Sequence, residues 1–287
     1  MNNANIISGK QIALDITDNI KSQVDQLKLT YNKVPSLAVI LVGTKIQSET
    51  YVRLKGLACK KAGINFILCR FDDDIEQTKV IDKIKELNMN DDINGILVQL
   101  PLPSKLNSTE ILDKIYPEKD IDGLSSINLG KLVSARDPLH IPCTPKGIIR
   151  ILDTIKIDLT GKKVVILGRS NIVGMPLFHM LLSRNATVTL CHSKTTNIID
   201  IIKSGDIVIS AIGIGHFVQG EWLKKGCVAI DVGINSSNDV NNKSLIGDFD
   251  FDSCIKNASF ITPVPGGVGP MTIAMVLENT LESFVRS

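Results

Sequence analysis

The stretch "KKVVILGRSNIVGMPLFHMLLSR" (162–184) runs from an apolar segment, through a turn that contains glycine, into a second apolar segment with helical spacing. Residues 162–168 are rich in β-branched side chains and predict a buried strand, and residues 173–184 predict a helix. A turn from a strand into a helix N-terminus directs backbone N–H groups and the positive end of the helix dipole at one point. The stretch therefore favours an α/β fold, and its turn is a candidate for binding phosphate.

The same alternation extends along the chain in both directions. Strands are predicted at 36–43, 64–71, 93–100, 186–191, 206–213, 226–233 and 259–262, and helices at 48–62, 78–88, 108–115, 145–155, 196–203 and 270–286. Strands that alternate with helices predict parallel βαβ units, and continuous β-branched runs suit strands covered on both faces. The expected fold is α/β, with two domains and a cleft between them.

Composition limits the classes of function. The chain has 287 residues, of which 44% are hydrophobic, enough for two ordinary cores. Its 32 Lys and Arg residues are balanced by 30 Asp and Glu residues without a basic block, which argues against a nucleic-acid partner. No apolar run approaches the roughly 20 residues that span a bilayer, and the N-terminal stretch lacks the pattern of a signal or transit peptide. We therefore expect a cytoplasmic protein without a membrane partner.

The six cysteines are scattered along the chain, none in a C-x-x-C pair and none at metal-ligand spacing from a histidine. In a chain of this length, such cysteines are mostly small core residues of a reducing compartment. The sequence therefore predicts neither a disulfide framework nor a metal site.

The turn "GRSNIVG" (168–174) departs from the dinucleotide motif G-x-G-x-x-G, because Gly168 and Gly174 flank five residues. Taken alone, it is as consistent with a plain βα turn bearing an exposed Arg169 as with a phosphate site.

The end of the next strand favours a phosphate site. NAD-binding folds place an acidic residue there to accept the ribose hydroxyls, but "LCHSKT" (190–195) contains no acid. His192, Ser193 and Lys194 offer donors instead, with Arg169 available from the preceding turn. This pattern favours a 2′-phosphate and hence NADP over NAD, although His192 read alone is equally an exposed loop histidine.

In the first half of the chain, "SETYVRLK" (48–55) places Ser48, Tyr51 and Lys55 on one helix face. Most Tyr and Lys pairs at this spacing are solvated neighbours, because lysine is rarely buried.

Two further polar residues favour a chemical site. Gln99 ends an otherwise apolar strand, where α/β folds place their binding crevices, and Asp122 lies in "EKDIDG" (118–123). Alone, Gln99 is consistent with a polar strand edge and Asp122 with an Asp-Gly turn. Together they predict a polar cluster in which burial lowers the pKa of Lys55 toward neutrality.

The assembled motifs carry a family resemblance. In order, they are "YVRLK" (51–55), "GILVQLPLP" (95–103), "PEKDIDG" (117–123), "PCTPKG" (142–147), "GRSNIVGMP" (168–176) and "PVPGGVGPMT" (263–272). From about residue 6 to 285, the sequence resembles the bifunctional methylenetetrahydrofolate dehydrogenase/methenyltetrahydrofolate cyclohydrolases, the FolD family. No single motif is specific, but their ordered combination is.

The resemblance implies two domains and two activities. Residues 1–140, completed by a C-terminal helix at 270–287, would form a folate-binding, catalytic domain of the amino-acid-dehydrogenase-like α/β type. Residues 141–269 would form a Rossmann-type NADP-binding domain. The implied reactions are the NADP-dependent oxidation of 5,10-methylenetetrahydrofolate to 5,10-methenyltetrahydrofolate and its hydrolysis to 10-formyltetrahydrofolate. Both belong to one-carbon metabolism, which feeds purine biosynthesis, and the implied assembly is a homodimer.

The resemblance also implies roles for individual residues. Lys55 would be the catalytic lysine of the hydrolysis, assisted by Tyr51 and Gln99, and Asp122 would hold the pterin. The implied tetrahydrofolate contacts are Tyr51, Lys55, Gln99, Leu100, Asp122, Pro265, Gly266, Gly269 and Pro270. The implied NADP contacts are Thr144, Gly168, Arg169, Ser170, Ile172, Val173, Gly174, His192, Ser193, Ile234 and Gly267. No metal is implied.

The stretch 261–272 combines three prolines with three glycines just before the last predicted helix. Its prolines restrict the direction of the chain, and its glycines let backbone pass close to flat rings. We expect a cis bond at Val264–Pro265, because a tight turn is the usual setting for one. Two alternatives remain at this stage, a shikimate-type dehydrogenase and a cofactor-binding protein without catalysis.

Overall fold

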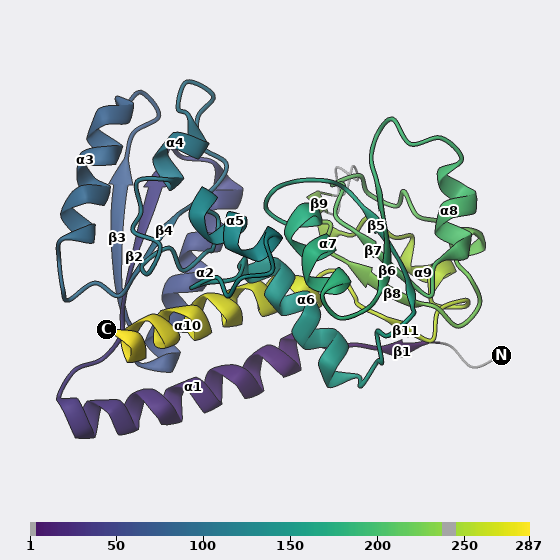
Figure 1. Ribbon diagram of the computed structural model, residues 1–287, viewed down its shortest axis with the longest axis horizontal. Helices are drawn as coiled ribbons and strands as arrows, with labels where there is room; N and C mark the ends of the chain where they lie inside the picture. The colour runs from purple at the N-terminus through teal and green to yellow at the C-terminus, as the bar shows by residue number, and fades with distance from the viewer. Residues whose placement is uncertain (1–3, 237–244) are drawn as a thin grey trace. The chain divides into compact units, whose positions relative to one another are not determined.

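The computed structural model describes residues 4–236 and 245–287, which form two compact α/β units (Figure 1). The three-stranded unit contains Leu14–Cys143 and Ile273–Ser287, and the six-stranded unit contains Thr144–Thr272 together with the residues up to Ala13. Three helices contribute residues to both units: α1 (Gly9–Tyr31), α6 (Cys143–Thr154) and α10 (Val268–Arg286).

The sheet of the three-stranded unit has the order β3-β2-β4, and both strand pairs are parallel. Its strands are β2 (Ser36–Val42), β3 (Asn65–Phe71) and β4 (Gly95–Val98). The helices between and after them are α2 (Ile46–Ala62), α3 (Gln77–Asn88), α4 (Ser108–Leu112) and α5 (Ser126–Val133). Every residue of the central strand β2 is buried, as expected for a parallel strand covered on both faces.

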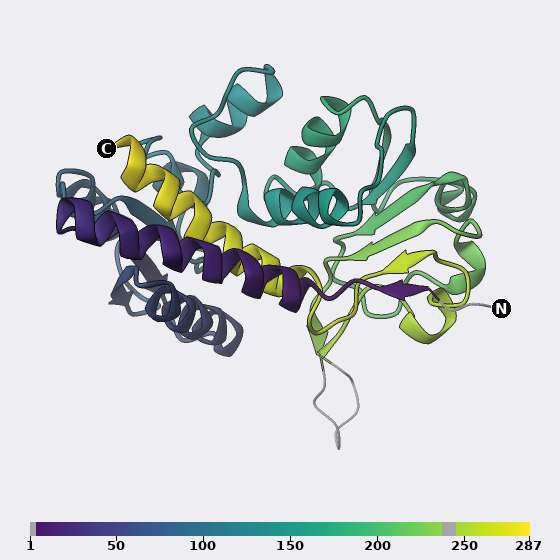
Figure 2. The ribbon, with the colours of Figure 1, turned by 90° about the horizontal axis from the view of Figure 1, so that it is seen from below.

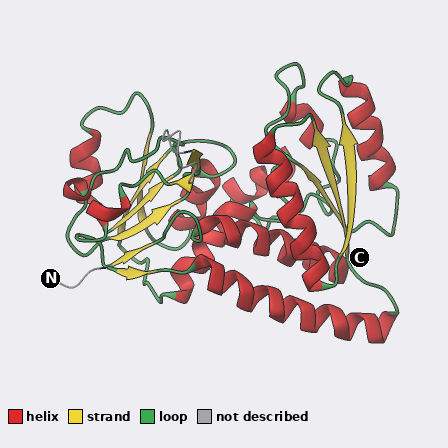
Figure 3. Cartoon of the chain, turned by 180° about the vertical axis from the view of Figure 1, so that it is seen from behind, coloured by secondary structure: helices red, strands yellow, loops and turns green. Residues whose placement is uncertain are grey.

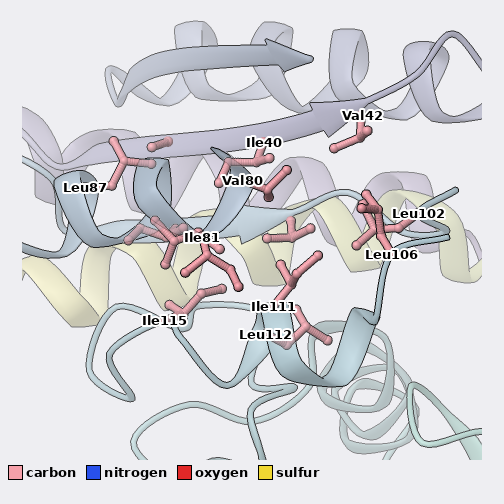
Figure 4. Close-up of a cluster of buried hydrophobic side chains, with 14 of the residues drawn as sticks. Ile40, Val42, Val80, Ile81, Leu87, Leu102, Leu106, Ile111, Leu112 and Ile115 are labelled. Atoms are coloured by element: carbon pink, nitrogen blue, oxygen red, sulfur yellow. The ribbon is translucent and has the colours of Figure 1, made fainter. Parts of the chain in front are cut away.

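One hydrophobic cluster fills the space between this sheet and two of its helices (Figure 4). Ile40 and Val42 of β2 contribute to it, together with Val80 and Ile81 of α3 and Ile111 of α4. This packing fixes the carboxyl end of β4, where Gln99 follows. A second face of the unit is closed by α1 and the C-terminal part of α10, which lie side by side in Figures 1 and 2.

The six-stranded unit has the strand order β1-β11-β8-β7-β5-β6, with parallel pairing throughout. Figure 3 draws the strands as yellow arrows. Its strands are β1 (Asn5–Ile6), β5 (Lys163–Leu167), β6 (Thr187–Cys191), β7 (Ile207–Ser210), β8 (Val228–Asp231) and β11 (Phe260–Ile261). The remaining elements are α7 (Gly174–Leu182), α8 (Ile198–Ser204), the 3₁₀ turn η1 (Gly220–Trp222), α9 (Phe251–Cys254) and the antiparallel pair β9 (Asn235–Ser236) and β10 (Leu245–Ile246).

In this sheet β5 lies between β6 and β7, so the chain leaves β5 on one side and later returns on the other. Such a reversal opens a crevice at the carboxyl ends of the strands, where α/β folds bind ligands. The turn 168–174 begins directly after β5 and therefore lies at this edge.

The structure confirms the predicted α/β fold with parallel sheets, and every predicted strand and helix is present with shifted ends. The sequence analysis missed α1, although Thr17, Ile20 and Val24 are buried at helical spacing. A threonine within the stripe and the surrounding polar residues hide the pattern. The helix predicted at 145–155 begins earlier, because α6 begins at Cys143, and Thr144 therefore lies in its first turn.

All six cysteines lie among the described residues, and all are free thiols. Within residues 4–236 and 245–287, no helix has the length and apolar character to cross a membrane. In the same residues, no group of three or more His, Cys, Asp or Glu side chains is arranged to hold a metal ion.

Candidate active site

Lys55 lies on the buried face of α2. The buried residues of this helix are Ser48, Val52, Lys55, Cys59 and Ala62, which recur at helical spacing. Lys55 thus occupies a position in a mostly apolar stripe, and only 6% of it is exposed. Tyr51, one turn earlier, is half-buried, and burial raises the pKa of its phenol.

The structure brings Lys55 and Gln99 together. Lys55 Nζ donates a hydrogen bond to Gln99 Oε1 at 2.8 Å, and Gln99 Nε2 donates to the carbonyl of Leu100 at 2.8 Å. The amide is thereby oriented with its oxygen toward the lysine. Burial lowers the pKa of Lys55, and the negative charge of Asp122 partly opposes that shift. A buried lysine with a lowered pKa gives up its proton more easily than an exposed lysine, and its neutral form can accept one.

The two acids of "EKDIDG" have different surroundings. Asp120 is 1% exposed and accepts hydrogen bonds from the backbone N–H of Ser125 at 2.9 Å and from Asn128 Nδ2 at 2.9 Å. Asp120 therefore holds its own loop together. Asp122 is half-buried; burial raises its pKa, while the charge of Lys55 lowers it. Asp122 is therefore the acid electrostatically coupled to Lys55.

Cys143 is a neighbour of this cluster that the sequence analysis did not identify. Cys143 Sγ donates to the carbonyl of Ile121 at 3.3 Å, and as an alternative hydrogen-bond partner the same thiol lowers the pKa of Asp122. Asn279 Nδ2 donates to the same carbonyl at 2.7 Å, so α10 helps to fix the Asp122 loop. Contacts over such sequence separations leave no local signal in the chain.

In the six-stranded unit, the glycines of the turn 168–174 are sites of close backbone approach. A Cβ on Gly168 would lie 2.5 Å from the carbonyl oxygen of Ala211, and one on Gly174 would lie 2.0 Å from the carbonyl oxygen of Gly168. Ser170 Oγ accepts the backbone N–H of Val173 at 3.2 Å, directly before α7. Arg169, Ser170 and Ile172 are exposed around this turn.

The loop after β6 orients His192, one of the hydrogen-bond donors predicted for the 2′-phosphate. The backbone N–H of Lys194 donates to His192 Nδ1 at 3.1 Å, which assigns the imidazole proton to Nε2. Thr195 closes the turn, because its Oγ1 accepts the N–H of His192 at 2.8 Å. His192 therefore presents an N–H donor, and Ser193 beside it is exposed. The sequence analysis did not single out Thr195.

The stretch 263–272 contains the predicted cis bond at Val264–Pro265, and a second one occurs at Leu100–Pro101. Gly266 has φ 103°, and a Cβ on Gly267 would lie 2.5 Å from the carbonyl oxygen of Pro263. Because α10 begins at Val268, the predicted contacts Gly269 and Pro270 lie in its first turn, earlier than expected. Two further predicted contacts are placed as follows: Ile234, which follows β8, is 39% exposed, and Thr144 Oγ1 lies 3.0 Å from Thr272 Oγ1.

A parallel sheet with a glycine turn at its switch point, together with a separate unit that holds a buried lysine, defines a nucleotide-dependent α/β enzyme. The sequence model described as "Tetrahydrofolate dehydrogenase/cyclohydrolase, catalytic domain" matches residues 7–122, and the model for the NAD(P)-binding domain of the same enzymes matches residues 142–287. The chain belongs to the tetrahydrofolate dehydrogenase/cyclohydrolase family.

Individual relatives agree with this assignment. The bifunctional protein FolD of Thermodesulfovibrio yellowstonii is 49% identical over 278 residues, which are 97% of this chain and 96% of that protein. The structure of the bifunctional enzyme FolD from Campylobacter jejuni has a TM-score of 0.95 at 41% identity and covers 99% of both chains. FolD of Trypanosoma brucei, complexed with NADP cofactor and inhibitor, has a TM-score of 0.96 at 38% identity and covers 100% of this chain and 99% of that one.

These comparisons confirm the predicted family and enzyme class, a tetrahydrofolate dehydrogenase/cyclohydrolase with a nicotinamide-dinucleotide domain. They set aside the shikimate-type dehydrogenase that the sequence had left as an alternative.

Proposed function

We propose that the chain oxidises 5,10-methylenetetrahydrofolate with NADP and hydrolyses the resulting 5,10-methenyltetrahydrofolate to 10-formyltetrahydrofolate, within one-carbon metabolism. The observation that carries this proposal is the buried Lys55–Gln99 hydrogen bond, electrostatically coupled to Asp122, in the region that matches the family's catalytic domain. A dehydrogenase alone would not need a lysine held in this state.

The oxidation demands positioning more than proton transfer. The two folate nitrogens share the positive charge that develops as hydride leaves the one-carbon bridge, so no strong base is required. When bound, NADP supplies the hydride acceptor. Asp122 is suited to accept hydrogen bonds from the 2-amino group and a ring N–H of the pterin. Leu100, the residue after Gln99, would add a folate contact within the same unit.

The residues of the six-stranded unit fit a dinucleotide. Gly168 and Gly174 leave no room for a Cβ, as a close phosphate turn requires, and α7 begins at that turn. His192 and Ser193 offer donors where an NAD site would offer an acid, with Arg169 exposed on the turn. This donor set supports NADP, the cofactor bound in the Trypanosoma brucei structure.

The hydrolysis needs a base. A water adds to the methenyl carbon and gives its proton to the neutral Nζ of Lys55. This leaves a hydroxyl on that carbon. The bond from the carbon to N5 then breaks as N5 takes up a proton and the hydroxyl loses its own, so that a formyl group remains on N10 and one proton is released overall. Gln99, which accepts a hydrogen bond from Nζ, would orient it, and Tyr51, one turn before Lys55 on α2, would orient the water.

We further propose that the chain is a cytoplasmic homodimer, with residues 1–140 and 270–287 as its folate-binding domain and residues 141–269 as its NADP-binding domain. The six free cysteines of the described residues support a reducing compartment. Light scattering on the purified chain tests the dimer, and a monomer at micromolar concentration would contradict it.

Two assays test the function separately. Methylenetetrahydrofolate with NADP should give NADPH, and methenyltetrahydrofolate without a cofactor should decay faster than in buffer. If the wild-type chain forms NADPH but does not accelerate the decay of methenyltetrahydrofolate, the protein is a dehydrogenase alone.

A further inference from the structure

Two buried carboxylates of the six-stranded unit have no part in the mechanism above. Asp231 is the last residue of β8 and is 4% exposed; Asp248 follows β10 and is fully buried. Carboxylates are seldom buried so completely unless hydrogen-bond donors surround them.

Asp248 accepts hydrogen bonds from three consecutive backbone N–H groups of the loop after β7. Its Oδ2 accepts from Ile212 at 2.8 Å and from Gly213 at 3.3 Å, and its Oδ1 accepts from Ile214 at 3.0 Å. Two side chains add donors: Ser210 Oγ at 2.9 Å and Asn235 Nδ2 at 3.1 Å. The carboxylate of Asp248 therefore fixes both the loop 212–214 and Asn235, the residue after Ile234.

Asp231 in turn holds Asp248 in place. Its Oδ1 accepts the backbone N–H of Asp248 at 2.9 Å and of Gly233 at 3.0 Å, and its Oδ2 accepts that of Phe249 at 2.9 Å. Burial raises the pKa of Asp231 to about 7, and the nearby Asp248 adds to that shift.

Close backbone approach makes this pair possible. A Cβ on Gly233 would lie 2.0 Å from Asp248 Oδ1, and a Cβ on Gly247 would lie 1.9 Å from Asp231 Oδ2. The segment "DVGIN" (231–235) thus supplies Asp231 and the glycine that leaves room for Asp248. The segment "GDFDF" (247–251) supplies Asp248 and the glycine that leaves room for Asp231.

The held loop borders the phosphate turn. The carbonyl oxygen of Ala211 lies 2.5 Å from where a Cβ of Gly168 would be. In the sheet β7 lies beside β5, and β8 lies beside β7 (Figure 1). The loop 212–214 and Ile234 therefore line the carboxyl edge at which the sheet reverses, where dinucleotides bind in this type of fold.

We infer that Asp248, held by Asp231, is a positioning residue for the dinucleotide: its carboxylate fixes the loop 212–214 and the 234–235 segment in the shape that receives the cofactor. The inference rests on the proposed function, because it assumes that NADP binds at this edge. Neither acid needs to touch the cofactor for this role.

The test is direct binding of NADPH, measured by fluorescence titration in the absence of folate. Asp248→Asn keeps the side-chain size but turns an acceptor oxygen into an N–H₂ that faces backbone donors. Loss of charge-assisted hydrogen bonds predicts an NADPH Kd raised about tenfold or more. The hydrolysis of methenyltetrahydrofolate should stay within about threefold of the wild-type rate, a split that general loss of structure would not produce.

Asp120→Asn is the matched control, because Asp120 is equally buried and accepts backbone and amide donors in the other unit. Its NADPH Kd should equal the wild-type value, and circular dichroism should show both variants folded. If Asp248→Asn does not fold, Ser210→Ala removes one donor from Asp248 and should weaken NADPH about threefold.

The inference would be overturned, and the proposed function left intact, if folded Asp248→Asn bound NADPH with unchanged affinity. Where Asp248→Asn does not fold, unchanged affinity in Ser210→Ala would have the same consequence. A wild-type chain that binds no NADPH would instead refute the proposed cofactor, on which the inference depends.

Discussion

Replacing Lys55 with methionine should separate the two activities. Methionine is unbranched and apolar, so it fits the buried stripe of α2 that Val52 and Cys59 also form. Lys55→Met removes the base but neither the dinucleotide turn nor the carboxylate of Asp122. The hydrolysis of methenyltetrahydrofolate should therefore fall while the oxidation of methylenetetrahydrofolate continues.

The size of the effect follows from the geometry. A positioned general base contributes roughly 10²- to 10⁴-fold, which is about 2.7–5.4 kcal/mol of transition-state stabilisation. Lys55 is only 6% exposed, so bulk solvent is poorly placed to act in its stead. The fold should survive: Gln99 Oε1 loses its donor, at a cost of about 1–3 kcal/mol, but the burial of an ammonium group is relieved as well.

The assay follows methenyl absorbance, corrected for spontaneous hydrolysis, alongside NADPH formation. Lys60→Met, an exposed lysine of the same helix, is the matched control and should keep both activities. If folded Lys55→Met hydrolyses methenyltetrahydrofolate within about threefold of the wild-type rate, Lys55 is not the base.

Three further outcomes are expected. The kcat for hydrolysis should rise with pH to a plateau, and its midpoint should lie below the ordinary lysine pKa of about 10.4, because burial lowers the pKa of Lys55. In Asp122→Asn, measured at saturating substrate, this midpoint should be lower still, because the negative charge that raises the pKa of Lys55 is gone. An unchanged midpoint would disprove the coupling between Lys55 and Asp122. Asp231 should contribute to the free energy of unfolding, measured in urea titrations, fully below about pH 4, and this contribution should be lost as pH rises through about 7, because the pKa of Asp231 is raised in the folded state. Asp231→Asn should lack this dependence of the unfolding free energy on pH. The same dependence in the variant and the wild type would refute the assignment. Gly174→Ala should weaken NADPH binding about tenfold or more, because the added Cβ would meet the carbonyl oxygen of Gly168. Gly130 has open space around it, so the control Gly130→Ala should bind NADPH as the wild type does.

The sequence predicted those features of the fold that periodic patterns carry. Apolar β-branched runs identified the strands, and the helical spacing of Tyr51 and Lys55 placed both on one face of α2. The helix α1 was missed because Thr17 interrupts its apolar stripe and polar residues surround it. Strand ends were predicted too long because the apolar runs continue past the last paired residue of the sheet, as at Ala211 and Ile212 after β7.

The candidate site was predictable where residue type and position coincide. Gln99 at a strand end and Asp122 in a turn are visible in one dimension, and the structure sets both beside Lys55 by a hydrogen bond and by electrostatic coupling. Cys143 and the pair Asp231 and Asp248 were not found, because their partners are distant in sequence and only folding brings them together.

A single progress curve tests the central claim most directly. The purified chain is supplied with 5,10-methylenetetrahydrofolate and NADP, and NADPH, methenyltetrahydrofolate and 10-formyltetrahydrofolate are followed together. We predict that methenyltetrahydrofolate rises and then decays, while 10-formyltetrahydrofolate approaches the amount of NADPH formed. Methenyltetrahydrofolate that accumulates to match NADPH, and decays no faster than in buffer, would contradict the account.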